Sequence, residues 1–186
     1  MTPLQRIEAQ LSADDYLTHR TSASADPRLE KLVIGLGRDA QQRDWILSLS
    51  FTSDVAAAFG VESDADEPVY FQIFLPLPFL VPGECLAEAA RLILHLNRLL
   101  PAGAFGLSDP EGAAYFQITQ IEESHELSPR KIGELVGLAA FFGRDFGAYI
   151  EALARGTKTR IEIITALESA GVTLHDIPPQ PGAARH

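Results

Sequence analysis

The stretch GLGRDA, from Gly35 to Ala40, matches the dinucleotide-binding fingerprint with alanine in the last place. That fingerprint holds a pyrophosphate only when the N-terminus of a helix follows the glycines. Here a polar turn and a strand-like run that contains Trp45 follow instead. We therefore interpret the glycines as a strand bulge or a strand end, with no bound cofactor.

Cys85 is the single cysteine and lies near the start of an expected helix, where exposed backbone amides can stabilise a thiolate. A nucleophilic cysteine also needs a base and an oxyanion site, and the sequence assigns no residue to either role. The alternative, a buried structural thiol, is favoured. A single cysteine also excludes an internal disulfide and a thiolate-rich zinc site.

Metal ligands do not form a recognisable pattern. The five histidines include no HExxH motif and no other closely spaced pair of ligands. The acidic cluster of Asp64, Asp66 and Glu67 lacks the glycine and the distal glutamate of an EF-hand loop, so we interpret it as a solvated turn. The sequence thus predicts no cofactor, no metal and no catalytic residue, and a protein that is not an enzyme.

Composition places the chain among ordinary globular proteins. It has 186 residues, of which 46% are hydrophobic and 22% charged. The formal net charge of -10 repels nucleic acid and anionic lipid surfaces. The N-terminal residues lack the features of a secretory signal, and every apolar run is shorter than the roughly 18 residues of a membrane span. We expect a cytoplasmic protein that binds neither nucleic acid nor membrane.

The first half of the chain predicts one helix and three strands. Leu4, Ile7 and Leu11 recur at helical spacing, so a first helix should end near His19, and residues 21–27 read as a linker. Alternating apolar residues then predict a hairpin, residues 29–36 with residues 45–51, and a third strand that begins at Val69. Three prolines remove the amide donors of a central strand, so the third strand should end or become an edge where they occur. They are Pro76, Pro78 and Pro82.

The second half predicts a helix, a hairpin and two more helices. A helix over residues 86–100 is followed by a second hairpin, over residues 105–121, which turns at SDPEG. Ser128 is the expected N-cap of one long core helix, and a terminal helix should be capped by Gly171. Two glycine pairs in the long helix indicate a packing demand. They are Gly133 with Gly137 and Gly143 with Gly147.

These elements predict an α+β fold in two layers, with an antiparallel five-stranded sheet and helices packed on it in the order α-β-β-β-α-β-β-α-α. We expect a single domain over residues 1–174 and a flexible tail over residues 175–186.

An apolar stretch at the end of the third strand is a candidate protein interface. Its residues lie where the strand loses regular pairing, so some of them should be difficult to bury, and exposed patches of this kind serve association. The alternative is that the segment folds back over the core. The candidate residues are Phe74, Leu77, Phe79, Leu80 and Val81.

Two longer stretches carry a family resemblance. They are LNRLLPAGAFGLSDPEGAAYFQ, from Leu96, and LSPRKIGELVGLAAFFGRDFGAYIEALARG, from Leu127. With the order of the elements, they resemble the YbjN-type bacterial sensory transduction regulators, whose fold is shared with the type III secretion chaperones. The resemblance covers about residues 4–156, and the expected helix over residues 157–171 is an addition. It implies a domain that dimerises and, in the secretion chaperones, an acidic protein that binds an extended client through apolar patches.

Two functional hypotheses follow. The first is a noncatalytic protein-binding domain, chaperone-like or regulatory, that acts as a homodimer and binds an unidentified protein. The alternative is a small-molecule-binding or enzymatic domain, for which Cys85 and Tyr115 near the ends of expected elements are the motivation. A deep polar pocket that unites distant residues would favour the alternative.

Overall fold

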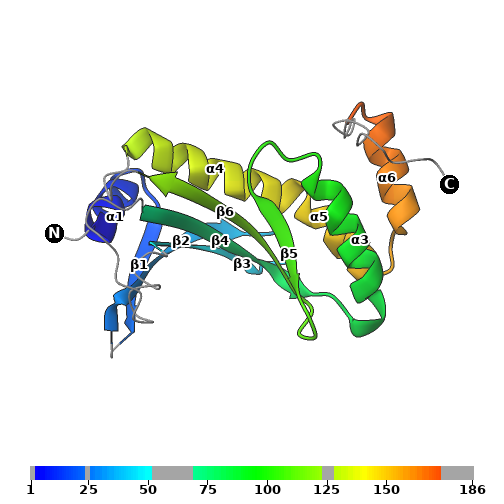
Figure 1. Cartoon of the computed structure of the whole chain (residues 1–186), viewed down its shortest axis with the longest axis horizontal. Coiled ribbons are helices and arrows are strands. Elements are labelled where there is room, and N and C mark those ends of the chain that lie inside the picture. Colours follow the sequence, from blue (N-terminus) through cyan, green and yellow to red (C-terminus); the bar gives the residue numbers. More distant parts are fainter. Residues whose placement is uncertain (1–2, 24–25, 52–68, 123–127, 173–186) are drawn as a thin grey trace, which may run out of the picture.

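The computed structural model describes residues 3–23, 26–51, 69–122 and 128–172 (Figure 1). Within them the fold is α+β, with one antiparallel sheet of six strands in the order β1-β2-β3-β4-β6-β5. The strands are β1 (Leu17–Ala23), β2 (Asp26–Arg38), β3 (Asp44–Phe51), β4 (Val69–Leu80), β5 (Ala104–Ser108) and β6 (Ala113–Glu122). The helices are α1 (Pro3–Ala13), η1 (Gly83–Cys85), α3 (Leu86–Asn97), α4 (Pro129–Asp145), α5 (Gly147–Ala154) and α6 (Arg160–Ser169).

The core lies between one face of the sheet and the helices. Alternation along β3 and β4 turns every second residue toward this core, so Leu47, Leu49, Phe71 and Ile73 are fully buried. Figure 1 shows α4 lying along this face, with α1 beside the β1 end of the sheet and α3 beside β5. The expected two-layer arrangement is confirmed.

The helix over the sheet begins where the sequence indicates and ends earlier. The Ser128 side chain accepts a hydrogen bond from the Lys131 backbone N–H at 3.2 Å, which caps α4 as predicted. The Lys131 ammonium also pairs with Glu122 of β6 at 2.5 Å and fastens the first turn of the helix to the sheet. One long helix was expected, but the chain divides at Phe146 into α4 and the short α5.

Asn97 connects α3 to the second hairpin. Its side-chain oxygen accepts from the Phe105 backbone N–H at 2.7 Å, and its side-chain amide donates to the Phe105 carbonyl at 3.0 Å. The hairpin turns between Ser108 and Ala113, as predicted, and Gly112 takes a positive φ of 70° there.

The terminal helix α6 is also present. Thr159 and Glu162 form a reciprocal capping box at its start, and Arg160 pairs with Glu88 of α3 at 2.9 Å. Ile163 and Leu167 are buried in the core. The additional helix expected after residue 156 is therefore packed against the domain.

The prediction of five strands is wrong by one. Residues 17–23 form β1, which pairs with β2. Residues 26–27, which belong to the predicted linker, begin β2. The first helix ends at Ala13, six residues before the expected end. Arg20 of β1 lies between Glu8 of α1 at 2.5 Å and Glu30 of β2 at 2.7 Å. β1 is an edge strand whose side toward α1 carries an ion pair, so it lacks the apolar alternation by which strands are recognised.

The prolines of β4 do not end the strand. Pairing with β3 extends from Phe71 to Phe74 and is absent at Pro76 and beyond, whereas pairing with β6 continues through Pro76 to Leu80 with an irregularity between them. Of the two predicted outcomes, edge character is confirmed on the β3 side, and the strand does not end at Pro76 or Pro78 because it stays paired with β6.

The described helices include none that combines the length and the hydropathy of a membrane-spanning helix. The acidic cluster at residues 64–67 and the tail at residues 175–186 lie outside the described residues.

Candidate functional site

The predicted apolar interface is divided by the strand that carries it. Leu77 and Val81 are only 6% and 3% exposed, so the prediction that they belong to a surface patch is corrected: they are core residues, because β4 stays paired with β6 in this region. Phe79 is half-buried. Phe74 is half-buried on the sheet face opposite the core, and Leu80 is 67% exposed.

A network of ion pairs connects the β2–β3 turn to α5. Asp39 shapes the turn, since its Oδ1 accepts hydrogen bonds from the backbone N–H groups of Gln41 and Arg43, each at 2.9 Å. Arg43 donates from Nε to Asp39 at 2.6 Å and from both terminal nitrogens to Glu151 of α5, at 2.8 and 2.9 Å. Arg155 contributes a further ion pair to Glu151 at 2.7 Å. Both carboxylates are therefore satisfied by protein donors.

The pKa values of this network are shifted in the directions that hold it charged. The hydrogen bonds from Arg43 lower the pKa of Glu151 and outweigh the opposing effect of burial. The bidentate bond to Glu151 raises the pKa of Arg43 in turn. For Asp39, partial desolvation acts to raise the pKa, but the hydrogen bonds and charge of Arg43 and the Gln41 amide lower it overall.

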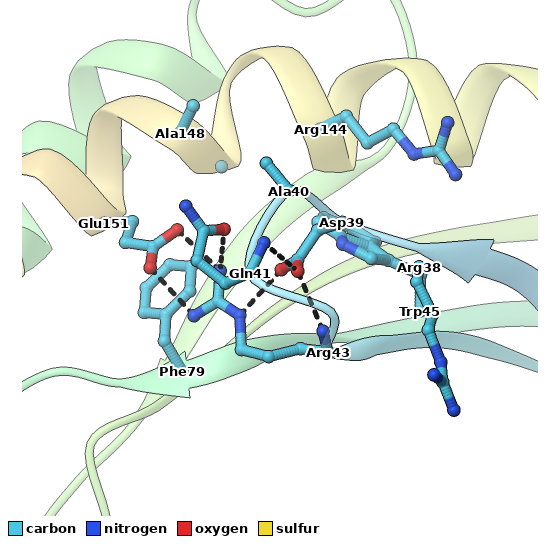
Figure 2. Close-up of a pocket in the computed structure, with 11 residues that line it drawn as sticks. Arg38, Asp39, Ala40, Gln41, Arg43, Trp45, Phe79, Arg144, Ala148 and Glu151 are labelled. Atoms are coloured by element: carbon cyan, nitrogen blue, oxygen red, sulfur yellow. Dashed lines mark hydrogen bonds and ion pairs between the residues drawn. The ribbon is translucent and has the colours of Figure 1, made fainter.

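A pocket of about 350 Å³ lies beside this network, between the β2–β3 turn and the junction of α4 with α5 (Figure 2). Its lining unites residues more than a hundred positions apart in the sequence. The lining residues are Arg38, Asp39, Ala40, Gln41, Arg43, Trp45, Phe79, Arg144, Gly147, Ala148 and Glu151.

The pocket has two unlike ends. In Figure 2, Glu151 and Phe79 lie at one end, and the side chain of Arg144 extends along α4 toward the other. The Arg43 guanidinium lies 6.0 Å from the centre of the Phe79 ring, and the Arg144 guanidinium lies 5.9 Å from the centre of the Trp45 ring. Each arginine is thus held over an aromatic ring.

Arg144 and Trp45 have unused donors. Arg144 donates from Nη2 to the Leu36 carbonyl at 2.6 Å, and no carboxylate among the described residues pairs with it. Trp45 is 6% exposed, and its indole Nε1 is the one buried side-chain polar atom without a hydrogen-bond partner in the described part of the chain. An unpaired buried donor costs on the order of 1–3 kcal/mol, so it requires an explanation.

The sheet face opposite the core is a second candidate site, which we call the open face. No described helix covers it (Figure 1). Its exposed apolar side chains include Leu17 on β1, Ile46 on β3 and Ile121 on β6. Val33, Ser48, Phe74 and Gln117 are successive cross-strand partners through the middle of this face.

Phe74 and Tyr115 form an aromatic pair on the open face. The rings of Phe74 and Tyr115 are 5.0 Å apart. Tyr115 occupies the space that a side chain at Gly106 of the neighbouring strand would need. A glycine at that position therefore lets the tyrosine ring lie across β5.

The other sequence-derived candidates have structural explanations. The strand is irregular between Gly35 and Arg38 and Gly37 has a φ of 86°, so the predicted bulge in GLGRDA is confirmed. Cys85 is half-buried at the end of η1, where full burial was expected. No group of three or more metal-ligating side chains occurs among the residues that the structure describes.

The packing interpretation of the helical glycines is half right. A Cβ at Gly143 would overlap Leu75, and one at Gly147 would lie 3.3 Å from Leu77, so both positions need a small residue. Gly133 and Gly137 have nothing within 4 Å, and the interpretation is wrong for them.

A scan against models of protein families matches none of them, and a search of curated proteins finds no match to this chain.

Proposed function

We propose that the chain is a noncatalytic protein-binding domain, chaperone-like or regulatory, that acts as a homodimer and resembles the YbjN-type regulators with their secretion-chaperone-like fold. The observation that carries the proposal is the open face, a broad sheet surface with exposed apolar residues and almost no charge. Alternation places only uncharged residues on it from Ile46 onward in β3, β4 and β6. Ionisable residues on the rest of this face include His19 and Lys31 on its β1–β2 side and the Arg38–Asp44 ion pair where β2 meets β3.

Depletion of charge and enrichment in tyrosine and phenylalanine are the features that distinguish the centre of a protein interface from ordinary surface. Phe74 and Tyr115 supply a rigid aromatic pair at the middle of the sheet, flanked by Ser48 and Gln117. Uncharged polar side chains of this kind can form hydrogen bonds across an interface without the desolvation cost of an ion.

A second copy of the chain suits this face because it brings no charge to the part formed by β3, β4 and β6 from Ile46 onward. Two chains with a net charge of -10 repel each other, and the repulsion is smallest where the contact surfaces are neutral. A basic partner would gain nothing there, since the face has no carboxylate from Ile46 onward in β3, β4 and β6. Two identical faces related by a two-fold axis form a closed contact, as in most homodimers.

The size of the face is compatible with a dimer of modest affinity. Six strands at about 4.8 Å spacing, with about six residues of each at roughly 3.3 Å, give a face of roughly 500 Å². A dimer would bury roughly 1,000 Å² in total, close to the lower limit for specific association.

Light scattering at micromolar concentration tests the homodimer. The wild type should have the mass of two chains, and Ser48→Arg, which adds a charge at the centre of the open face, should have the mass of one. Ala166→Arg, which adds the same charge at an exposed position of α6, is the matched control and should remain dimeric. A monomeric wild type contradicts the homodimer, whereas a dimeric Ser48→Arg contradicts only the use of this face.

The unidentified protein partner is tested at Leu80, the most exposed residue of the predicted apolar stretch. Leu80→Asp should recover less of a co-purifying protein than the wild type does, and equal recovery would count against this position. Phe79 is a poorer choice for such a variant, because its ring contacts the Arg43 guanidinium of the ion-pair network.

A second candidate function is small-molecule binding. The observation that favours it is the pocket of about 350 Å³, which unites the β2–β3 turn with α4 and α5.

A further inference from the structure

We propose that the pocket between the β2–β3 turn and the α4–α5 junction binds a small organic acid, with the carboxylate of the ligand on the Arg144 guanidinium and its apolar part against the wall near Phe79 and Ala148. This inference is independent of the homodimer and of the open face. It rests on the charges of the lining, on the donors that the protein leaves unused, and on the size of the pocket.

The charge of the lining favours an anion. Three arginines and two carboxylates line the pocket, which leaves one positive charge in a chain whose net charge is -10. Arg43 and Arg155 together neutralise Asp39 and Glu151, and Arg38 pairs with Asp44 at 2.9 Å. The positive charge without a carboxylate partner in the described part of the chain is that of Arg144.

The Arg144 guanidinium is held in position for a ligand. Arg144 is exposed, but one N–H donates to the Leu36 carbonyl and the planar group lies over the Trp45 indole, so two contacts orient it. A guanidinium has five N–H donors, and one of them makes the hydrogen bond to the Leu36 carbonyl, which leaves a pair of donors for a carboxylate. Little conformational freedom of this side chain would be lost on binding.

Trp45 supplies a second donor next to the same charge. Its Nε1 has no partner among the described residues, and the side chain lines the pocket. Because Nε1 is itself covered, a ligand oxygen would reach it only if the lining opens around the ligand. Acceptance of this N–H by the ligand would remove the penalty of leaving it unpaired.

The other residues that line the pocket do not favour a cation or a phosphate ester as the ligand. A cationic ligand would need a carboxylate, but those of Asp39 and Glu151 already accept hydrogen bonds from arginines and from backbone N–H groups. A phosphate ester is usually held by several cationic or backbone donors, whereas Arg144 is one. Phe79, Ala40, Gly147 and Ala148 offer apolar contacts, and a volume of about 350 Å³ lies at the small end of ligand pockets.

Trp45 is the only tryptophan of the chain, so its fluorescence and its single indole N–H signal in a ¹H–¹⁵N NMR spectrum both report on the pocket. Titration of the full chain with sodium benzoate should give a saturable shift of both signals. Benzamide, a neutral molecule of similar shape, and inorganic phosphate should bind at least about tenfold more weakly. A linear, unsaturated response to benzoate, or equal responses to benzoate and benzamide, would overturn the proposal.

Variants of α4 separate the role of Arg144 from a general effect of charge. Arg144→Gln should weaken benzoate binding about tenfold or more, and Arg144→Lys should keep part of it. Arg130→Gln removes the same charge from a fully exposed position on the same helix and should bind benzoate as the wild type does. Circular dichroism verifies that each variant is folded. Loss of the Arg144–Trp45 contact changes the tryptophan fluorescence by itself, so the affinities of the variants are taken from the NMR titration. Wild-type affinity in folded Arg144→Gln would refute the assignment.

Discussion

The glycines of α4 allow the same substitution, glycine to alanine, to be tested at positions where it should have opposite effects on stability. Gly133 and Gly137 lie in helical backbone with open space where a Cβ would be. Gly143 is buried, and its missing Cβ would overlap a methyl group of Leu75 and lie 3.0 Å from Cζ3 of Trp45. We expect Gly137→Ala to stabilise the protein and Gly143→Ala to destabilise it.

The magnitudes follow from two opposing effects. Alanine in place of glycine in a helix gains about 0.4–1 kcal/mol, largely from the lower entropy of the unfolded chain. At Gly137 nothing opposes this gain, and a chain of this length should melt about 1–4 °C higher. At Gly143, overpacking costs about 1–3 kcal/mol, because Leu75 is fully buried and has no free space into which to move. The net expectation there is a loss of up to about 2.6 kcal/mol.

Urea denaturation followed by circular dichroism, with a thermal melt of each variant, measures the difference directly. Gly133→Ala is the internal replicate and should behave like Gly137→Ala. A Gly143→Ala variant that is stabilised as much as Gly137→Ala would refute the packing of α4 against Leu75 and Trp45. A destabilised Gly137→Ala would show that this helical face is occupied in solution.

Three further variants test other contacts of the fold and of the ion-pair network. Asn97→Ala removes both hydrogen bonds to the Phe105 backbone and should cost about 1–3 kcal/mol in urea denaturation. Glu151 has a lowered pKa in the folded protein, so the stability that its charge contributes is complete above the unfolded pKa of about 4.3 and is lost as the pH falls through the folded pKa. Glu151→Gln should therefore be less stable than the wild type at pH 7. The variant should also lose less stability than the wild type between about pH 5 and pH 3. Thr159→Ala breaks the capping box of α6 and should lower the stability of that helix by about 1 kcal/mol. Relative to the wild type, hydrogen exchange should become faster in α6 and should change less in α4.

Much of the fold follows from local sequence patterns. The strands with strict alternation, β3 and the first part of β4, and the capped helix that begins after Ser128 are where the sequence places them. These elements bury an apolar face on their own, so their period is visible without knowledge of the partner. β1 has no such face, because Arg20 lies between two carboxylates on the side toward α1.

The pocket has no comparable signal in the sequence. Asp39 and Arg43 are recognisable only as parts of a polar turn, and Glu151 is one of many helical carboxylates. Their contact depends on the path of the chain through β3, β4, β5 and β6 and through α3 and α4, among the described elements, and no local pattern contains this path. The burial of Leu77 and Val81 depends in the same way on the pairing of β4 with β6, which continues past Pro76 where the prolines suggested an end.

The ion pairs of Arg20 also bear on whether another strand can add to the β1 edge of the sheet. A strand from another molecule could extend the backbone ladder beside β1 or beside β5, the two edge strands of the described sheet. At β1 it would lie where a guanidinium and two carboxylates point toward the layer of α1. An added strand would desolvate these charged groups without providing new partners for them. End-to-end growth into fibres is therefore discouraged at this border by the same residues that attach the first helix.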